Sequence, residues 1–133
     1  MKKKIIVVED DPFSQNFYNI ILSKTGFEAI IIENADEVLN RVRTDSIAVI
    51  IMDINLKNTY LEGKKIDGAI LSKIIKSDKN LHIPVLIITA FSPSIKGNTF
   101  FEESLADDYI IKPIIDYNIL LQKINELIDI YER

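Results

Sequence analysis

Short apolar runs alternate with stretches of helical periodicity along the whole of this chain. Each run is continuous and rich in β-branched residues, which is typical of a strand buried on both faces of a sheet. The predicted strands are Lys4–Val8, Glu28–Ile32, Ile47–Met52, Pro84–Thr89 and Tyr109–Ile111. Strands that alternate with helices form a parallel sheet with helices on both faces. The alternation therefore predicts an α/β fold.

Helix signals fill the gaps between these strands. Asp11 and Pro12 are a favourable N-cap and first helical residue, and Gly26 is a favourable stop. Further helices are expected over Asn34–Val42, after the N-cap Asp67, within Ser92–Ala106, and along the apolar face of Leu120, Leu121, Ile124, Leu127 and Ile128. The helix within Ser92–Ala106 is expected to start late, because this stretch contains Pro93 and Gly97.

Composition narrows the classes of function. The 133 residues suffice for one domain, and a net charge of −4 disfavours direct binding to nucleic acid. No apolar run is long enough to span a bilayer, so we expect no membrane insertion and a cytoplasmic location. The absence of cysteine excludes disulfides, thiol nucleophiles and cysteine-based metal sites. The single histidine, His82, lies in a predicted loop and is expected to be structural.

Polar residues follow the predicted strands at the points where they end. These residues are Glu9 and Asp10 after the first strand, Asp53 and Asn55 after the third, Thr89 and Ala90 at the fourth, and Lys112 and Pro113 after the fifth. In a parallel sheet the carboxyl ends of the strands share one edge, where ligands bind near a topological switch point. We therefore expect these side chains to gather in one site.

The chemistry of this set favours a metal ion and a phosphoryl group. Like-charged carboxylates repel each other by roughly 3 kcal/mol per pair at about 5 Å, and such a cluster raises a pKa or recruits a cation. Oxygen ligands without Cys or His suit Mg²⁺. Lys112 would offer a positive charge and Thr89 a hydroxyl donor to a phosphoryl group. The Asp53 carboxylate is able to act as nucleophile and form an aspartyl phosphate.

Four motifs in order resemble the response-regulator receiver domain. They are VVEDD (Val7–Asp11), IIMDINL (Ile50–Leu56), IITA (Ile87–Ala90) and DDYIIKP (Asp107–Pro113). An acid pair after an apolar strand is common by itself, but four motifs with matching strand context are highly specific. The resemblance covers essentially the whole chain and implies one receiver domain over residues 1–133. It also implies a flavodoxin-like (βα)5 fold, a doubly wound sandwich with strand order 2-1-3-4-5.

The resemblance assigns roles to the residues at the strand ends. Asp53 would accept phosphate from a phosphohistidine on a sensor histidine kinase or a histidine phosphotransfer protein. Mg²⁺, or Mn²⁺ in its place, would be bound directly by Asp10 and Asp53, through water by Glu9, and by the backbone carbonyl of Asn55. Lys112 would pair with a phosphate oxygen. A receiver of this kind catalyses only its own phosphorylation and dephosphorylation and is not an enzyme in the usual sense.

The resemblance also implies a switch. The Thr89 hydroxyl and the Ala90 amide would bind the phosphoryl group in the active state, and Tyr109 would change rotamer when Thr89 moves. The Lys112–Pro113 peptide resembles the family's cis bond, which would aim the lysine into the site. The remodelled surface would comprise the fourth helix, fifth strand and fifth helix. Because the last helix runs to Arg133, output is expected through protein contact or onward phosphate transfer, in a monomer or weak dimer.

Two features depart from the pattern of the family. Leu56–Lys65 resembles an insertion of several residues beside the acceptor aspartate, and its polar composition predicts a mobile loop. Two functional interpretations are a loop that recognises a partner and a cover over the phosphate. The alternative is a surface insertion without a function, which is tolerated because closing a longer loop costs little entropy. Phe91, two residues beyond Thr89, is bulky, and we expect it to shield the phosphate from water.

Three other functions compete with the receiver. A haloacid-dehalogenase-type phosphatase also combines an aspartate nucleophile with Thr, Lys and Mg²⁺, but it usually carries an acid/base aspartate where this chain has Asn55. A flavin-binding protein of similar topology is disfavoured, because Glu9 and Asp10 would repel the cofactor phosphate. A pseudo-receiver that never takes phosphate is disfavoured by the complete set Glu9, Asp10, Asp53, Thr89 and Lys112.

Overall fold

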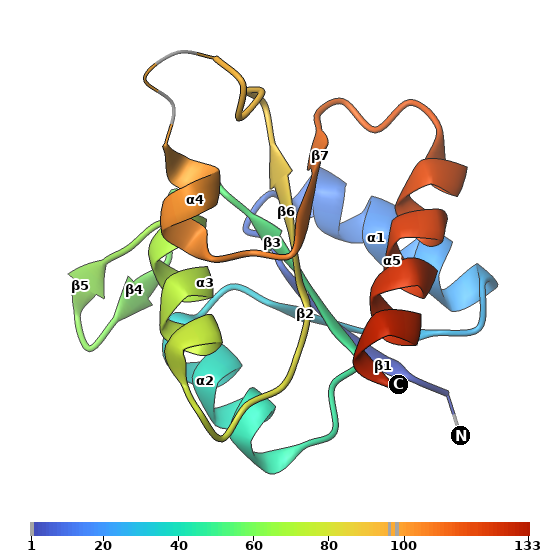
Figure 1. Cartoon of the computed structure of the whole chain (residues 1–133), viewed down its shortest axis with the longest axis horizontal. Coiled ribbons are helices and arrows are strands. Elements are labelled where there is room, and N and C mark those ends of the chain that lie inside the picture. The colour runs from blue at the N-terminus through green and yellow to red at the C-terminus, as the bar shows by residue number, and fades with distance from the viewer. Residues whose placement is uncertain (1, 96, 98) are drawn as a thin grey trace.

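Five strands form one parallel sheet in this computed structural model, which describes residues 2–95, 97 and 99–133. The strands are β1 (Lys4–Val8), β2 (Glu28–Ile32), β3 (Val49–Asp53), β6 (Val85–Thr89) and β7 (Asp108–Ile111). Their order is β2-β1-β3-β6-β7, and every neighbouring pair is parallel (Figure 1). Numbered along the chain, this is the predicted flavodoxin-like order 2-1-3-4-5. The strand order reverses between β1 and β3, which is the switch point at which such sheets bind ligands.

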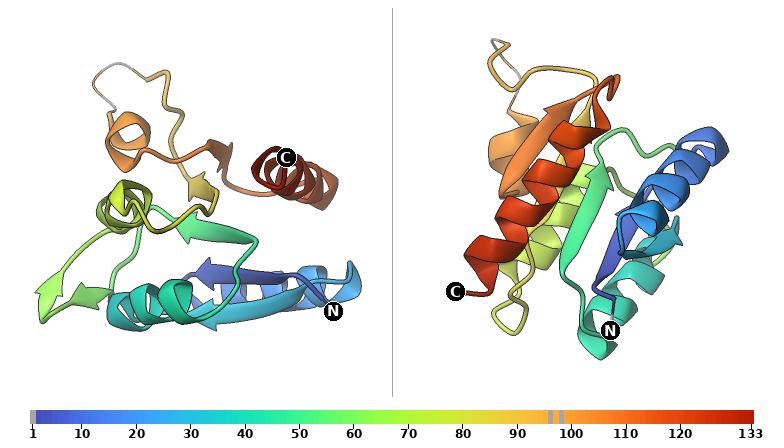
Figure 2. Two further views of the ribbon diagram at one scale, coloured as in Figure 1. Left: turned by 60° about the horizontal axis from the view of Figure 1, so that its bottom comes forward. Right: turned by 90° about the vertical axis from the view of Figure 1, so that its right-hand side faces the viewer.

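The helices cover both faces of the sheet. They are α1 (Pro12–Lys24), α2 (Ala35–Thr44), α3 (Gly68–Ser77), α4 (Phe100–Ser104) and α5 (Tyr117–Tyr131). Helices α1 and α5 lie on one face, and α2, α3 and α4 lie on the other (Figure 2). Along β1 the side chains alternate between two apolar clusters: Ile5 and Val7 pack with α1 and α5, and Ile6 and Val8 pack with α2 and α3. This period of two explains why the strands are apolar throughout.

Side-chain caps begin three of the helices, and two of them, Asp11 and Asp67, were predicted. Asp11, Asn34 and Asp67 each accept a hydrogen bond from a backbone amide in the first turn, at Ser14, Glu37 and Ile70 respectively. These bonds satisfy donors that have no partner within the helix. Asn34 is therefore the cap of α2 and not its first residue, and the helix continues two residues beyond the predicted end, to Thr44.

Helix α4 is short and begins late, as the sequence predicts. It comprises only Phe100–Ser104. Two residues of the Ser92–Ala106 stretch, 96 and 98, lie outside the described residues. After the helix Leu105 adopts a left-handed conformation with φ 58° and forms the C-cap.

The inserted segment was predicted to be an irregular, mobile loop, and this prediction is wrong about its structure. It contains an antiparallel hairpin of β4 (Tyr60–Leu61) and β5 (Lys64–Lys65). Glu62 and Gly63 form the turn with φ 50° and 80°, the two positive angles that a tight hairpin favours. The strands were missed because each has only two residues, which is too short for an alternating pattern to develop.

The edge of the sheet opposite the carboxyl ends holds a polar cluster. The Lys76 ammonium lies 2.9 Å from Asp107 Oδ2 and also donates to the Tyr131 hydroxyl. The His82 ring stacks on the Tyr131 ring with centroids 4.5 Å apart. His82 thus lies at the far end of the sheet from Asp53, in agreement with a structural role. Within the described ranges no helix has the length and apolar character that crossing a membrane requires.

Candidate functional site

The carboxyl ends of the central strands meet at one edge of the sheet, at the top of Figure 1. Glu9 follows β1 directly, Asp53 ends β3, and Lys112 follows β7. A cleft of about 320 Å³ opens at this edge. Among the residues that line it are Glu9, Asp10, Asp53, Asn55 and Lys112. The structure therefore brings these five predicted site residues together, although they come from three separate segments of the chain.

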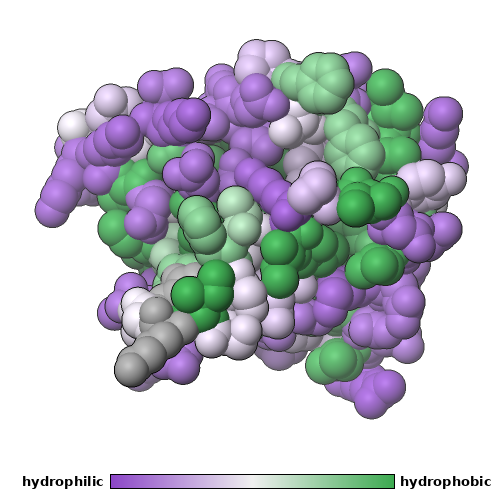
Figure 3. All heavy atoms as spheres, turned by 90° about the horizontal axis from the view of Figure 1, so that it is seen from above, coloured by the Kyte–Doolittle hydropathy of each residue, from purple (hydrophilic) through white to green (hydrophobic). Residues whose placement is uncertain are grey.

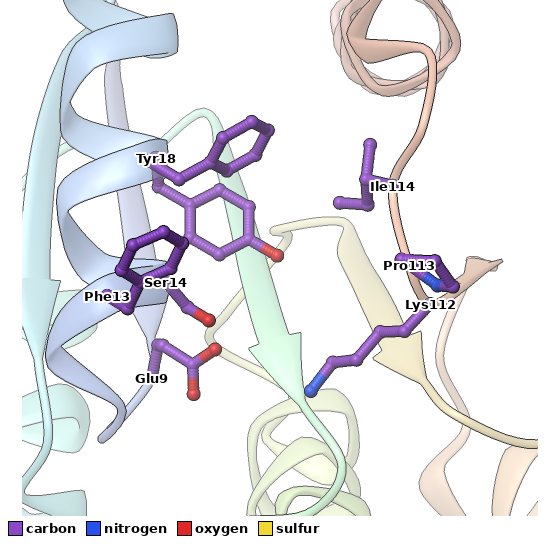
Figure 4. A pocket seen from close by; sticks show the side chains of 8 residues that line it. Glu9, Phe13, Ser14, Tyr18, Lys112, Pro113 and Ile114 are labelled. Atoms are coloured by element: carbon purple, nitrogen blue, oxygen red, sulfur yellow. The ribbon is translucent and has the colours of Figure 1, made fainter.

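Two partners hold one carboxylate oxygen of Asp53. Its side chain is buried, and Oδ1 lies 2.9 Å from the Lys112 Nζ. The same oxygen accepts a hydrogen bond from the Asn55 amide at 3.1 Å. The Lys112–Pro113 peptide is cis, as predicted, and the lysine side chain points toward Glu9 (Figure 4). An ammonium and an amide thus fix one carboxylate oxygen of Asp53.

Glu9 is a buried carboxyl with only 2% of its surface exposed. Burial raises its pKa to about 8, and the neighbouring Asp53 carboxyl adds to the rise, while the Lys112 ammonium opposes it. The Asp10 amide donates to Glu9 Oε2 at 3.1 Å. Two carboxyl groups and one ammonium in a buried site leave an excess of negative charge. A proton on Glu9 or a bound cation would neutralise this excess.

Asp10 lines the same cleft but bonds to the inserted segment. Its Oδ2 accepts hydrogen bonds from the Lys57 amide at 2.7 Å and from the Asn58 amide at 2.9 Å. Across residues 2–95, 97 and 99–133, no three His, Cys, Asp or Glu side chains form a cluster able to hold a metal ion. The direct ligands implied by the resemblance are of another kind, two carboxylates and one backbone carbonyl, so Mg²⁺ binding stays a prediction.

The donor chemistry of the cleft fits a hard cation. All of the candidate ligands at Glu9, Asp10, Asp53 and Asn55 are oxygens, and no soft ligand is present among them. The cleft has room for an ion that keeps several of its waters, as Mg²⁺ usually does.

Thr89 and Ala90 lie at the end of β6 and do not line the cleft in the described part of the chain. The Thr89 hydroxyl is fully buried and bonds to Phe91, accepting from its amide at 3.1 Å and donating to its carbonyl at 3.2 Å. Phe91 itself is 63% exposed and is not among the residues that line the cleft. Shielding of a phosphate by Phe91 stays a prediction.

Tyr109 is half-buried in β7, where its ring makes an edge contact with Phe101 at 5.2 Å between centroids. The ring packs against the apolar cluster of α2 and α3, and Phe100 joins the same cluster. Tyr109 therefore lies beside α4, three residues before the cleft residue Lys112. A change of its rotamer stays a prediction.

Two contacts of the site were missed by sequence reasoning. One is the contact of the Lys57 and Asn58 backbone amides with Asp10, which does not depend on the side chains of these two residues and so leaves no pattern in the sequence. The other is Gly68, the first residue of α3: a Cβ atom built there would lie 2.1 Å from the Asp53 carbonyl oxygen. The sequence places Gly68 directly after the N-cap Asp67, but it does not show that this glycine touches the backbone of Asp53.

A second, apolar groove of about 300 Å³ adjoins the cleft. Figure 4 shows Phe13, Ser14 and Tyr18 of α1 on one side and Pro113 and Ile114 on the other. Both Glu9 and Lys112 line this groove as well as the cleft. Seen from above, hydrophobic side chains gather in the right-hand half of the molecule, over α1 and the segment between β7 and α5 (Figure 3).

Comparison with known proteins decides the family. The family described as the response regulator receiver domain matches residues 5–125. This chain is a response regulator receiver domain. The receiver is 32% identical over 119 residues to the polar-differentiation response regulator DivK of Brucella anthropi, covering 86% of this chain and 87% of DivK. Its fold matches the CheY-like receiver domain protein of Methanospirillum hungatei with a TM-score of 0.80, at 26% identity and with 99% and 98% of the two chains covered.

Other relatives of the receiver are longer proteins. The alkaline phosphatase synthesis transcriptional regulatory protein PhoP of Bacillus subtilis is 29% identical over 113 residues, which span 85% of this chain but 43% of PhoP. The chain therefore spans less than half the length of this relative. Receiver domains work in two-component signalling with histidine kinases or phosphotransfer proteins, and the predicted family membership is confirmed.

Proposed function

We propose that Asp53 accepts a phosphoryl group from the phosphohistidine of a sensor histidine kinase or a histidine phosphotransfer protein. The observation that carries this proposal is the buried Asp53 carboxylate, with Lys112 Nζ 2.9 Å from Oδ1, in a cleft that is open to a partner. The family membership of the chain supports it. Asn55 occupies the place of the acid/base aspartate of phosphatases, which favours a phosphate that is held as a signal. The receiver is proposed to act in the cytoplasm.

The transfer needs little covalent machinery from the protein. An Asp53 carboxylate oxygen attacks phosphorus in line with the phosphorus–nitrogen bond, which breaks and leaves its electron pair on the histidine imidazole. Lys112 neutralises charge on the phosphoryl oxygens. Asp10 and Asp53 would hold Mg²⁺ or Mn²⁺ directly, with the Asn55 carbonyl, and Glu9 would do so through water. When bound, this ion would supply further neutralisation of the same oxygens.

The apolar groove beside the cleft is proposed to seat the helix that carries the donor histidine. The groove is continuous with the cleft, because Glu9 and Lys112 belong to both. Phe13, which lines the groove, is 85% exposed, and Ile115, the residue after the lining residue Ile114, is 89% exposed. Such exposure is unusual for large apolar side chains without a partner. A donor helix with a small apolar patch next to its histidine would bury these groups.

The phosphorylated state is proposed to differ at Thr89. To bind the phosphoryl group, the Thr89 hydroxyl has to leave its two bonds to Phe91, and the space that it vacates beside β7 becomes available to Tyr109. The surface of α4, β7 and α5 would change with it, and this surface exposes Leu105, Ile111 and Ile119. Phosphorylation would thus shift the population between two states of a protein-contact surface.

The test is phosphorylation by a small-molecule donor. The protein is incubated with acetyl phosphate and Mg²⁺ and is then examined by intact mass for one base-labile phosphoryl adduct. We expect this adduct on the unmodified protein and none on Asp53→Asn. Asp107→Asn is the matched control, since it makes the same change at the opposite edge of the sheet and should leave the adduct unchanged. An equal adduct on Asp53→Asn, or none on the unmodified protein, contradicts the proposal.

Mg²⁺ affinity is expected to depend on pH through Glu9. The pKa of Glu9 in the metal-free fold is about 8, raised from 4.5, so the carboxyl carries a proton below that pH. A cation bound beside this carboxyl favours its ionised form, so the apparent affinity should rise with pH up to about pH 8 and then level off. Calorimetric titration with Mg²⁺ in buffers of different ionisation enthalpy measures both the affinity and the proton release.

The control for this pH dependence is Glu9→Gln, which has no proton to release. Its Mg²⁺ affinity should vary little across the same range. If the unmodified protein binds Mg²⁺ equally well at every pH below about 8, the ionisation of Glu9 is not coupled to Mg²⁺ binding.

A further inference from the structure

The inserted segment of this receiver reaches into the acceptor site through its backbone. The amides of Lys57 and Asn58 both donate to Asp10 Oδ2, at 2.7 and 2.9 Å. Asp10 lies 47 residues before Lys57, so this contact joins the β1–α1 turn to the start of the insertion. Hydrogen bonds to a carboxylate are charge-assisted and are stronger than those between neutral groups. The two amides therefore fix the orientation of the Asp10 side chain.

The other oxygen of Asp10 is left available. Considering residues 2–95, 97 and 99–133, Oδ1 accepts no hydrogen bond and forms no ion pair. Asp10 nevertheless lines the same cleft as Asp53 and Asn55. One oxygen is thus committed to the insertion, and one is free to bind a ligand in the cleft.

The two amides are held in place by buried anchors on both sides. Leu56, just before them, is 4% exposed and belongs to the apolar cluster of α2 and α3. Thr59, just after them, is fully buried, and its hydroxyl donates to the Glu33 carbonyl at 3.0 Å. The Ile66 amide then closes the hairpin by donating to the Thr59 carbonyl at 3.0 Å. A segment anchored in this way is a rigid support and not a free loop.

We propose that Lys57 and Asn58 are positioning residues for the cation site, with their amides holding Asp10 so that Oδ1 faces the ion. This inference rests on the proposed function, because it concerns the ion expected to take part in phosphorylation. A carboxylate that is already oriented loses less side-chain freedom when it binds a cation. Loss of a group that hydrogen-bonds to a metal ligand typically weakens metal affinity by about 10- to 100-fold.

The first test removes one amide proton. Asn58→Pro lacks the backbone N–H, whereas Asn58→Ala keeps it and removes only the side chain. We expect Mg²⁺, titrated alone and followed by calorimetry, to bind Asn58→Pro at least about tenfold more weakly, and Asn58→Ala within about twofold of the unmodified protein. Equal Mg²⁺ affinity of the proline variant and the unmodified protein overturns the inference.

The second test needs no variant and remains available if the proline variant does not fold. Hydrogen exchange of the Lys57 and Asn58 amides is measured by NMR with and without Mg²⁺. We expect both amides to exchange several-fold more slowly with Mg²⁺, because an Asp10 that binds the ion holds them more tightly. The Glu62 amide, which donates to Asp36 at 3.3 Å, is the internal reference and should not change. Unchanged or faster exchange at both amides overturns the inference.

The two proposals fail in different ways. If the protein forms the Asp53 adduct and binds Mg²⁺, but Asn58→Pro does not change the Mg²⁺ affinity, the proposed function holds and the inference is overturned. A protein that binds no Mg²⁺ overturns both.

Discussion

Gly68→Ala is expected to destabilise the receiver by about 3 kcal/mol, because the new methyl group has no room. The Cβ would lie 2.1 Å from the Asp53 carbonyl oxygen and 2.9 Å from the Asp53 carbonyl carbon and Ile54 Cα. These are backbone atoms at the end of the central strand β3 and in the residue that follows it, and they cannot rotate away as the end of a side chain would. Chemical denaturation in urea measures the free energy of unfolding, and the phosphorylation rate should fall with it, because any relief of the clash moves Asp53.

Gly26→Ala is the control for this effect. Gly26 has φ 89° but nothing within 4 Å of its would-be Cβ, so alanine there should cost only the left-handed conformation, about 1 kcal/mol. It should leave the phosphorylation rate unchanged, since Gly26 precedes β2 at the opposite edge of the sheet from the cleft. If Gly68→Ala costs no more than Gly26→Ala, the close approach of α3 to Asp53 does not constrain the fold.

Lys112→Met is expected to slow phosphorylation of Asp53 by about 100-fold, which is typical of the loss of one positioned electrostatic partner. The Lys112 ammonium lies 2.9 Å from Asp53 Oδ1, and its side chain lines the cleft together with Glu9. Without it, two carboxyl groups face each other, and an incoming phosphoryl group meets a more negative site. The rate of adduct formation with acetyl phosphate and Mg²⁺, followed by intact mass, measures the effect.

The matched control is Lys123→Met. Lys123 also forms an ion pair, at 2.8 Å from Asp108, and its replacement changes the net charge by the same amount. Its side chain lies on α5, outside the cleft, so the rate should stay within about twofold of the unmodified protein. If both variants are phosphorylated at a similar rate, Lys112 affects phosphorylation only through the net charge of the protein and not through its position in the cleft.

Much of the fold follows from signals that are local in sequence. A strand buried on both faces has to be apolar at every position, and Ile5 to Val8 show this directly. Helix starts were visible because capping uses side chains such as Asp11 and Asp67. The hairpin of β4 and β5 was missed, because strands of two residues are too short to show a period.

The sequence by itself determined which residues end the strands, and with them the family and the place of the site. Parallel strands share one edge, so Glu9, Asp53 and Lys112 had to meet there. Only the tertiary structure decided which atoms of the insertion and of α3 contact that site. The amides that hold Asp10 and the contact of Gly68 with Asp53 involve backbone atoms, whose hydrogen bonds and packing space depend on how distant segments come together and not on which side chains they carry.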